Sequence, residues 1–191
     1  MRFAEIIPDT ESGFRSIIDS RFDTKNDSTD AISCRPLSAD FAAAFHLVAS
    51  DAGTWADFLS HPMLWPVCSR KFCDQVSAIL DPQAVQIVPA PIFSREGALV
   101  RGDFFLLNPL IQVDCLDAQR SHVIWQPETA YANRYIRHID NMTLRNGSIP
   151  PSAALFRLTG ALSWLLVRED LVASLKHANC TGYALKWVGV M

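Results

Sequence analysis

Cys115 is the side chain whose neighbours most resemble those of a catalytic nucleophile, because Asp114 and Asp117 flank it. A nucleophilic cysteine reacts as its thiolate, however, and nearby carboxylates raise the thiol pKa by disfavouring that negative charge. This arrangement therefore opposes cysteine catalysis. Aspartates at the end of a strand commonly accept hydrogen bonds from turn amides, so turn capping is the role that the sequence favours for both acids.

No other combination of residues has the spacing of a catalytic or metal site. Cys68 and Cys73 lie five residues apart, but a structural zinc ion needs four ligands and no matching pair stands out. The five histidines are never spaced as a pair on one helix face. Glycine-rich phosphate loops, Gly-x-Ser-x-Gly elbows and His-Glu-x-x-His helices are missing from the sequence. We therefore expect no enzyme activity, cofactor or metal, with an enzyme of unknown substrate as the alternative, because catalytic groups often leave no local motif.

Charge and composition limit the class of partner. The chain has 191 residues, of which 17 are basic and 20 acidic, giving a net charge of −3. Nucleic-acid binding requires a clustered positive surface, so we expect no nucleic-acid partner. Apolar residues make up 49% and charged residues 19% of the chain, and soluble domains average roughly 25% charged residues. This balance predicts either a large core or an apolar surface that contacts a partner.

The sequence indicates a cytoplasmic protein that does not cross a membrane. The first twenty residues contain no apolar segment of signal-peptide length. No run of 18 apolar residues is long enough for a membrane helix. Five widely spaced cysteines are an odd number, and without an export signal they are typical of reduced, mostly buried thiols.

Two strand-helix-strand units should position the remaining residues. In the first, a strand at 64–67 precedes a helix capped by Ser69, which ends at Asp81-Pro82 because proline disfavours helical geometry in the residue before it. Alternation from Val85 to Ile87 then predicts a strand. The second unit has a strand at 164–167, a helix at 169–177 and an alternating final strand from Tyr183. Asn179 to Gly182 supplies a left-handed helix stop.

Further strands are expected between and before these units. The candidates in the middle of the chain are 104–107, 110–113, 139–145 and 155–158, and Pro109 must lie at a bulge or an edge. Residues 1–36 should be mostly loop apart from a strand at 3–7. A helix capped by Ser38 should bury Phe41, Phe45 and Val48, and one more helical turn should follow at 55–59.

These elements predict an α+β fold with a mixed, largely antiparallel sheet, the two strand-helix-strand units and an N-terminal helical elaboration. Residues 1–63 would form the N-terminal strand, loop and helical elaboration, and residues 64–191 the α+β core. We expect both parts to belong to one structural domain.

Several short motifs occur in an order that resembles one family of bacterial immunity proteins. They are spread over residues 64–188, in the family's order. They are Val67-Cys-Ser69, Phe104-Phe-Leu-Leu-Asn108, Asp114-Cys-Leu-Asp117, Ile149-Pro150 with Leu155-Phe-Arg-Leu158, Val167-Arg-Glu-Asp170 and Thr181-Gly-Tyr183. The pattern is similar to the immunity protein family numbered eleven of polymorphic toxin systems. The N-terminal sixty residues lack the family's expected opening with tryptophan and glycine.

The resemblance implies a stoichiometric inhibitor without catalytic residues. Its partner would be a cognate secreted toxin, either a polymorphic toxin or a type VI secretion effector, and a homodimer is also compatible. An adaptor or enzyme on the same fold is the alternative from another class.

The segment at 125–137 is the predicted contact region because aromatic and arginine side chains dominate binding energy at interfaces. Those side chains are Trp125, Tyr131, Arg134, Tyr135 and Arg137. The alternative is that Trp125 and Ile136 are core residues on two strands, with the arginines in solvent beside them. Residues 14–30, which contain several acids, are the competing contact surface.

Overall fold

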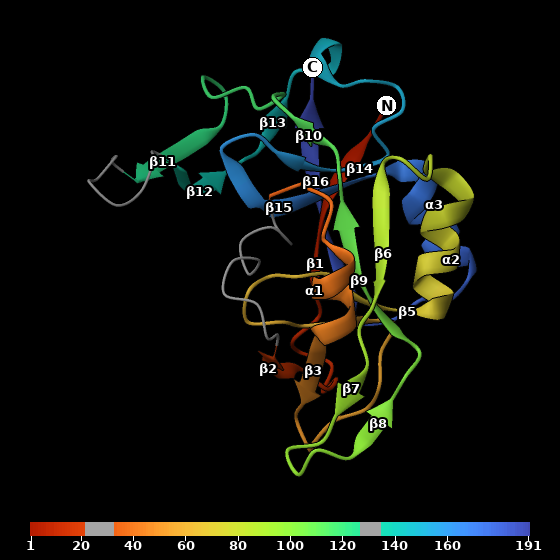
Figure 1. Ribbon diagram of the computed structural model, residues 1–191. Coiled ribbons are helices and arrows are strands. Elements are labelled where there is room, and N and C mark those ends of the chain that lie inside the picture. Colours follow the sequence, from red (N-terminus) through yellow and green to blue (C-terminus); the bar gives the residue numbers. More distant parts are fainter. Residues whose placement is uncertain (22–32, 127–134) are drawn as a thin grey trace.

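The computed structural model describes residues 1–21, 33–126 and 135–191 (Figure 1). The fold is mostly β, with 44% strand and 16% helix, as the α+β prediction required in outline. The helices are α1 Ala39–Ala44, α2 Arg70–Ile79 and α3 Glu169–His177, with a 3-10 helix η2 at Asn146–Ser148. The strands are β1 Phe3–Pro8, β2 Ile17–Arg21, β3 His46–Ala49, β4 Phe58–Leu59, β5 Val67–Ser69, β6 Val85–Pro89, β7 Ile92–Phe93, β8 Leu99–Arg101, β9 Phe104–Pro109, β10 Gln112–Val113, β11 His122–Gln126, β12 Tyr135–Asp140, β13 Thr143–Leu144, β14 Leu155–Leu158, β15 Ala161–Arg168 and β16 Tyr183–Val190.

These strands form four sheets where the sequence predicted one. The largest has the order β10-β14-β15-β1-β16-β13, two four-stranded sheets have the orders β4-β5-β9-β6 and β2-β3-β7-β8, and β11 pairs with β12 alone. Most pairs are antiparallel, and the parallel ones are β10 with β14, β13 with β16 and β3 with β7. The described strands are therefore mixed and largely antiparallel, as predicted. The buried side chains form three clusters, and each cluster contains residues from two of these sheets.

Both predicted strand-helix-strand units are present, and each encloses a third strand. In the first unit, β5 and β6 both pair with β9, which lies antiparallel between them. In the second, β15 and β16 both pair with β1 from the N-terminus. Helices α2 and α3 lie side by side on one flank of the molecule (Figure 1), and one apolar cluster joins them to the strands of both units.

Local chemistry explains both helices. Ser69 begins α2 by accepting a hydrogen bond of 3.3 Å from the Phe72 N–H, which confirms the predicted cap. Helix α3 has two acids in its first turn and two basic side chains in its last turn, which suits the helix dipole. The predicted left-handed stop after α3 is confirmed, since Asn179 has φ 53° and Gly182 has φ 88°.

The N-terminal helical predictions were partly wrong. Residues 55–59 form no helical turn, because Phe58 and Leu59 pair as β4 with Cys68 and Val67 of β5. Helix α1 begins after Ser38 but ends at Ala44, and the predicted helical position Val48 lies in β3, paired with Asp19 of β2. In both places, pairing with another strand overrides the local helical pattern.

Other strand boundaries also differ from those predicted. The expected strand at 64–67 is β5 at Val67–Ser69, and the expected strand at 110–113 is reduced to Gln112–Val113. The expected strand at 139–145 is divided between β12 and β13 by Asn141, which has φ 52°. Pro109 ends β9, beyond the residues that pair with β5, so it disrupts no ladder on that side.

The N-terminus is part of the largest sheet. Strand β1 lies between β15 and β16, with Phe3 opposite both Arg168 and Val188. Both ends of the chain consequently lie at the same end of the molecule (Figure 1). The boundary between 63 and 64 stays a prediction, and so does the assignment of the whole chain to one domain.

Candidate binding site

The described ends of the predicted contact region, residues 125–126 and 135–137, belong to a two-stranded ribbon of β11 and β12 that projects from the body of the molecule (Figure 1). Its strands β11 and β12 pair from His122 opposite Asp140 to Gln126 opposite Tyr135, with a bulge between Ile124 and Trp125. The ribbon is attached at its buried side through Ile136, whose N–H donates to the Gly160 carbonyl at 2.9 Å.

The two faces of the ribbon differ in burial. Ile136 and Ile139 are buried in the apolar cluster beneath it. Tyr135 and Arg137, the neighbours of Ile136 on β12, face solvent, and Tyr135 is 48% exposed. Trp125 is paired opposite Ile136 but is still 38% exposed. The alternative that placed both Trp125 and Ile136 in the core is therefore correct only for Ile136. Tyr131 and Arg134 lie outside the described residues.

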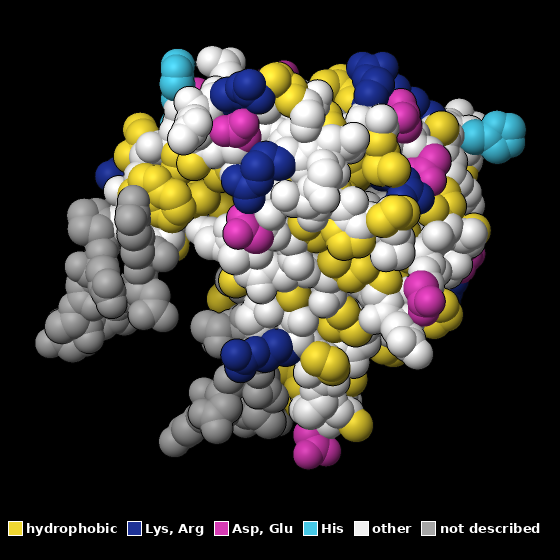
Figure 2. Space-filling model, turned by 90° about the horizontal axis from the view of Figure 1, so that it is seen from above, with side chains coloured by type: hydrophobic (Ala, Val, Ile, Leu, Met, Phe, Trp, Pro, Cys, Tyr) yellow, Lys and Arg dark blue, Asp and Glu magenta, His cyan; other side chains and the backbone are white. Residues whose placement is uncertain are grey.

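Apolar surface continues around the ribbon. The view from above shows apolar side chains gathered on the part formed by β11 and β12 (Figure 2). Elsewhere on this face, basic and acidic side chains are interspersed (Figure 2). Such a mixture does not provide the single-signed field that steers nucleic acid. This face is better suited to a protein surface with its own mixed charges.

A groove of about 420 Å³ lies between the ribbon and the largest sheet. Arg137, His138 and Ile139 of β12 form one wall. Residues of three adjacent sheet strands and of the segment before β5 form the rest of the lining: Glu5, Ile6, Ile7, Pro8, Ser163, Trp164, Leu165, Lys186, Phe58, Leu64, Trp65 and Pro66. The groove is mostly apolar and has a few charged side chains, the usual composition of a recognition site.

Glu5 and Lys186 form the charged pair of this groove. They are directly opposite each other on β1 and β16, and both also line a second hollow towards β13. Burial raises the pKa of the Glu5 carboxyl above its usual value, and the nearby Lys186 ammonium only partly offsets this effect. A carboxyl with a raised pKa is partly desolvated without full compensation, so Glu5 would gain from a hydrogen-bond donor supplied by a partner.

The acids around Cys115 serve the fold. Asp117 accepts hydrogen bonds from the amides of Gln119 and Arg120 at 3.1 and 3.2 Å, which confirms turn capping. Asp114 instead forms an ion pair of 3.1 Å with Arg145. Burial is the main cause that raises the pKa of Cys115 to about 12. The Asp114 charge also raises this pKa, but it contributes less than burial, although the sequence pointed to the carboxylates alone. The thiol is consequently protonated at neutral pH.

The other cysteines give no sign of metal binding or a reactive thiol. All five are free thiols, and Cys68, Cys73 and Cys115 are buried. Burial again raises the pKa of Cys68, with a contribution from Cys73. Among residues 1–21, 33–126 and 135–191, no three His, Cys, Asp or Glu side chains are grouped to hold a metal ion. No helix in those same ranges is long and apolar enough to cross a membrane.

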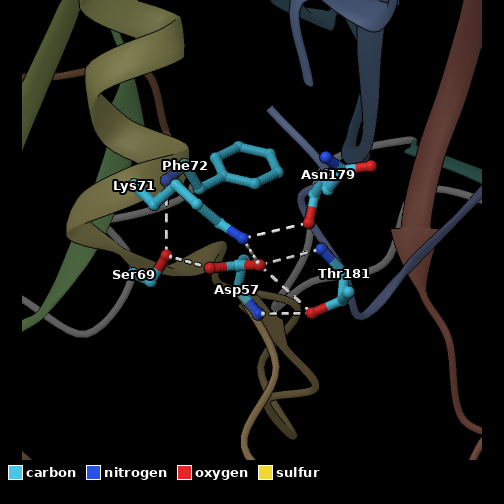
Figure 3. Close-up of polar contacts among 6 residues, drawn as sticks. All are labelled: Asp57, Ser69, Lys71, Phe72, Asn179 and Thr181. Carbon is cyan, nitrogen blue, oxygen red and sulfur yellow. Dashed lines mark hydrogen bonds and ion pairs between the residues drawn. The ribbon is translucent and has the colours of Figure 1, made fainter. Parts of the chain in front are cut away.

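A polar cluster around Asp57, which the sequence did not reveal, joins the two strand-helix-strand units (Figure 3). One carboxylate oxygen accepts from the Ser69 hydroxyl at 2.7 Å. The other accepts from the Thr181 N–H at 2.9 Å and lies 2.8 Å from the Lys71 ammonium, which also donates to the Asn179 carbonyl. We call these five residues the Asp57 junction. Burial raises the Asp57 pKa, but the hydrogen bonds from Lys71, Ser69 and Thr181 outweigh it and lower the pKa overall. Such a satisfied cluster stabilises the fold.

The competing contact surface at 14–30 is described only as far as residue 21. Phe14 and Ile17 pack with the N-terminal apolar cluster, while Ile18 is exposed. Residues 22–30 of that prediction lie outside the described ranges. The described part therefore offers less exposed aromatic surface than the ribbon.

Comparison with known proteins supports the resemblance found in the sequence. The model of a family described as an immunity protein family, Imm11, matches residues 6–190. This match extends well to the N-terminal side of the motifs quoted above and includes the second half of β1, from Ile6 to Pro8. A comparison with curated proteins found no match.

Proposed function

The chain belongs to the Imm11 immunity protein family, and from that premise we propose that it neutralises a cognate secreted bacterial toxin by one-to-one binding. The toxin would be a polymorphic toxin or a type VI secretion effector. The observation that carries this proposal is the family match over residues 6–190. The protein would act as a binder without turnover, in the cytoplasm, where its five free cysteines stay reduced.

We propose that the ribbon and the adjacent groove form the contact face. The ribbon presents Trp125, Tyr135 and Arg137, the residue types that most often dominate binding energy. The groove beside it can receive an apolar side chain of the partner, with Glu5 and Lys186 available for polar contacts. Tyr131 and Arg134 remain proposed contacts by their position in the same segment.

Binding to the toxin domain encoded in the adjacent reading frame tests this function. A lethal enzyme has to be held nearly fully bound, so we expect nanomolar affinity or better, which an interface of about 1,600 Å² can supply. Calorimetry and rescue of cells that express the toxin domain are the two measurements. Millimolar binding together with no rescue would contradict the proposed function.

Paired variants test the contact face. Tyr135→Ala combined with Arg137→Ala should weaken binding by about a hundredfold, since each truncation at an interface centre costs about 1–2 kcal/mol. The matched control is Leu99→Ala combined with Val100→Ala, because these side chains are also exposed but lie on β8 at the opposite end of the molecule (Figure 1). Equal affinity of the two double variants would remove the ribbon from the interface while leaving the function intact.

A further inference from the structure

Strand β16 has an open outer edge along most of its length. In the largest sheet its neighbours are β1 and β13. Pairing with β1 extends over Tyr183–Val188, whereas β13 pairs only with Gly189 and Val190. Within the described ranges, residues 183–188 therefore have a strand partner on one side alone.

The hydrogen bonds at the two ends of β16 determine which amides face outward. The Asp9 N–H donates to the Gly182 carbonyl, so residues 182, 184, 186 and 188 direct their backbone groups towards β1. Pro8, which has no N–H, lies opposite Tyr183 at a position that makes no ladder bond. On the other side, the Gly189 N–H donates to the Met142 carbonyl. The N–H and C=O groups of Tyr183, Leu185 and Trp187 consequently face away from β1.

No segment among the described residues covers this edge, in contrast to the edge of β6. There the Gln86 side chain accepts from the Leu37 N–H at 2.7 Å and donates to the Leu37 carbonyl at 2.9 Å, so a loop covers the strand. On β16, Lys186 and Trp187 are exposed instead. Uncovered strand edges are templates for pairing, and natural proteins normally protect them.

We propose that the cognate toxin docks by adding an extended segment to the outer edge of β16. This proposal rests on the proposed function and specifies how the toxin would be bound. Alternating outward N–H and C=O groups at Tyr183, Leu185 and Trp187 fit a polypeptide strand, because they exchange hydrogen bonds with an extended backbone. The second hollow, of about 390 Å³, lies at the end of this edge between Trp187 and Asn141 and can receive a side chain of the added strand.

A toxin strand suits this edge better than a second copy of the chain. Antiparallel pairing of two β16 edges around Leu185 or Lys186 would bring two Lys186 side chains close together on one face, and like charges in such positions are destabilising. Lys186 also lines the groove that Arg137 and His138 border. A strand added at β16 would therefore extend the same contact face that includes the ribbon.

Amide hydrogen exchange, followed by NMR on the full chain with and without the neighbouring toxin domain, tests the proposal without any variant. Exchange at Leu185 and Trp187 should slow by about tenfold or more in the complex, since a hydrogen bond then protects each amide. A complex that forms with unchanged exchange at both amides overturns the strand addition and leaves the proposed function standing. Failure of the wild-type chain to bind the toxin domain overturns both.

Two substitutions at one position isolate the backbone contribution. Trp187→Pro and Trp187→Ala both remove the indole, but only proline removes the outward N–H, and proline is tolerated on an edge strand at such a position. The proline variant should bind the toxin domain about tenfold more weakly than the alanine variant, the effect of one unmade hydrogen bond. Equal affinities overturn the proposal, and if the proline variant does not fold, the exchange measurement on the wild type decides. If, without toxin, exchange of these amides became slower as the protein concentration was raised, two copies would be pairing at this edge. That result would also overturn the proposal.

Discussion

Two regions of the molecule differ in whether their polar groups have partners. One is the Asp57 junction. The other is the open margin, by which we mean β11, β12, the groove and the outer edge of β16. At the junction, every oxygen of the Asp57 carboxylate accepts from the protein itself, and its pKa is lowered. At the margin, Glu5 is partly buried with a raised pKa, and three outward amides of β16 have no partner among the described residues. Satisfied polar groups stabilise the fold, whereas unsatisfied ones are available to another molecule. The difference separates the part that maintains the structure from the part that we expect to bind.

The junction and the residues next to it should be more sensitive to a change in shape, and Gly182, which follows the junction residue Thr181, gives the largest expected effect. It has φ 88°, and a Cβ added there would lie 2.2 Å from the Phe58 carbonyl oxygen and 2.5 Å from the Ala56 Cβ. Gly182→Ala should lower the free energy of unfolding by about 3 kcal/mol or more, through backbone strain and displacement of the Phe58 segment. Urea unfolding measures the loss.

Gly147→Ala is the matched control for that substitution. Gly147 has no atom within 4 Å of an added Cβ and no positive φ, so its replacement should change the free energy of unfolding by no more than about 0.5 kcal/mol. Equal stability of the two variants would contradict the close packing at the junction.

Removal of the Asp57 carboxylate should have the next largest effect. Asp57→Ala leaves Ser69, Lys71 and the Thr181 amide without their shared acceptor, which should cost about 2–3 kcal/mol of unfolding free energy. Because the folded pKa of Asp57 is lowered, its contribution is present above the unfolded pKa and is lost as the pH falls through the folded value. Binding of the toxin domain at a temperature where the variant is folded should be unchanged, and weaker binding would place the junction in the interface.

Much of the fold could be predicted where the signal was local. The Ser69 cap and the helix stop at Asn179 to Gly182 depend on residues within one or two turns, and both are present. Residues 55–59 look equally helical, but Phe58 pairs with Cys68 and the bridge from Phe14 reaches Thr54. Short apolar runs do not reveal which strand they will pair with, so tertiary pairing decided these elements.

The part of the candidate site that depends on neighbouring residues in the sequence was also predictable. Tyr135 and Arg137 were found from the local density of interface residue types, and both are exposed on the ribbon. Glu5 and Lys186 were missed because 181 positions separate them and only the register of β1 against β16 brings them together. The Asp57 junction was missed for the same reason, since its members come from three separate parts of the chain.

Acid should lower the stability of the folded protein through His61, which lies behind the groove residue Trp65. His61 is stacked on Trp65 with ring centroids 4.7 Å apart, and its Nδ1 accepts from the Met63 N–H. Burial lowers the pKa of His61 to about 4, with a small opposing effect of Asp19. Between that value and the unfolded pKa near 6.5, the unfolded chain binds the proton that the folded chain excludes, so stability falls as the pH falls.

The loss from His61 between pH 7 and pH 4.5 should be about 2 kcal/mol. The comparison is with His61→Phe, which keeps an aromatic ring against Trp65 and cannot titrate. The wild type should lose more unfolding free energy than this variant over the interval, as followed by urea unfolding at several pH values. Parallel curves for the two proteins would show that His61 is not excluded from protonation in the folded state.

Glu5 should give the smallest effect on stability, and one of opposite sign to Asp57. Because burial raises its folded pKa, the charged form is disfavoured in the folded chain, and the stability that Glu5 contributes at low pH is lost as the pH rises through the folded pKa. Glu5→Gln should therefore increase the free energy of unfolding at pH 7, by about 0.5 kcal/mol or less, because solvent screens this half-buried group.

If Glu5 serves binding, the same variant should bind the toxin domain more weakly although it is more stable. Glu169→Gln is the control, since Glu169 is also next to β1 through the Arg2 amide but lies outside the groove. A destabilised Glu5→Gln variant would mean that this carboxylate supports the fold as Asp57 does, and the contrast between the two regions would then fail at Glu5.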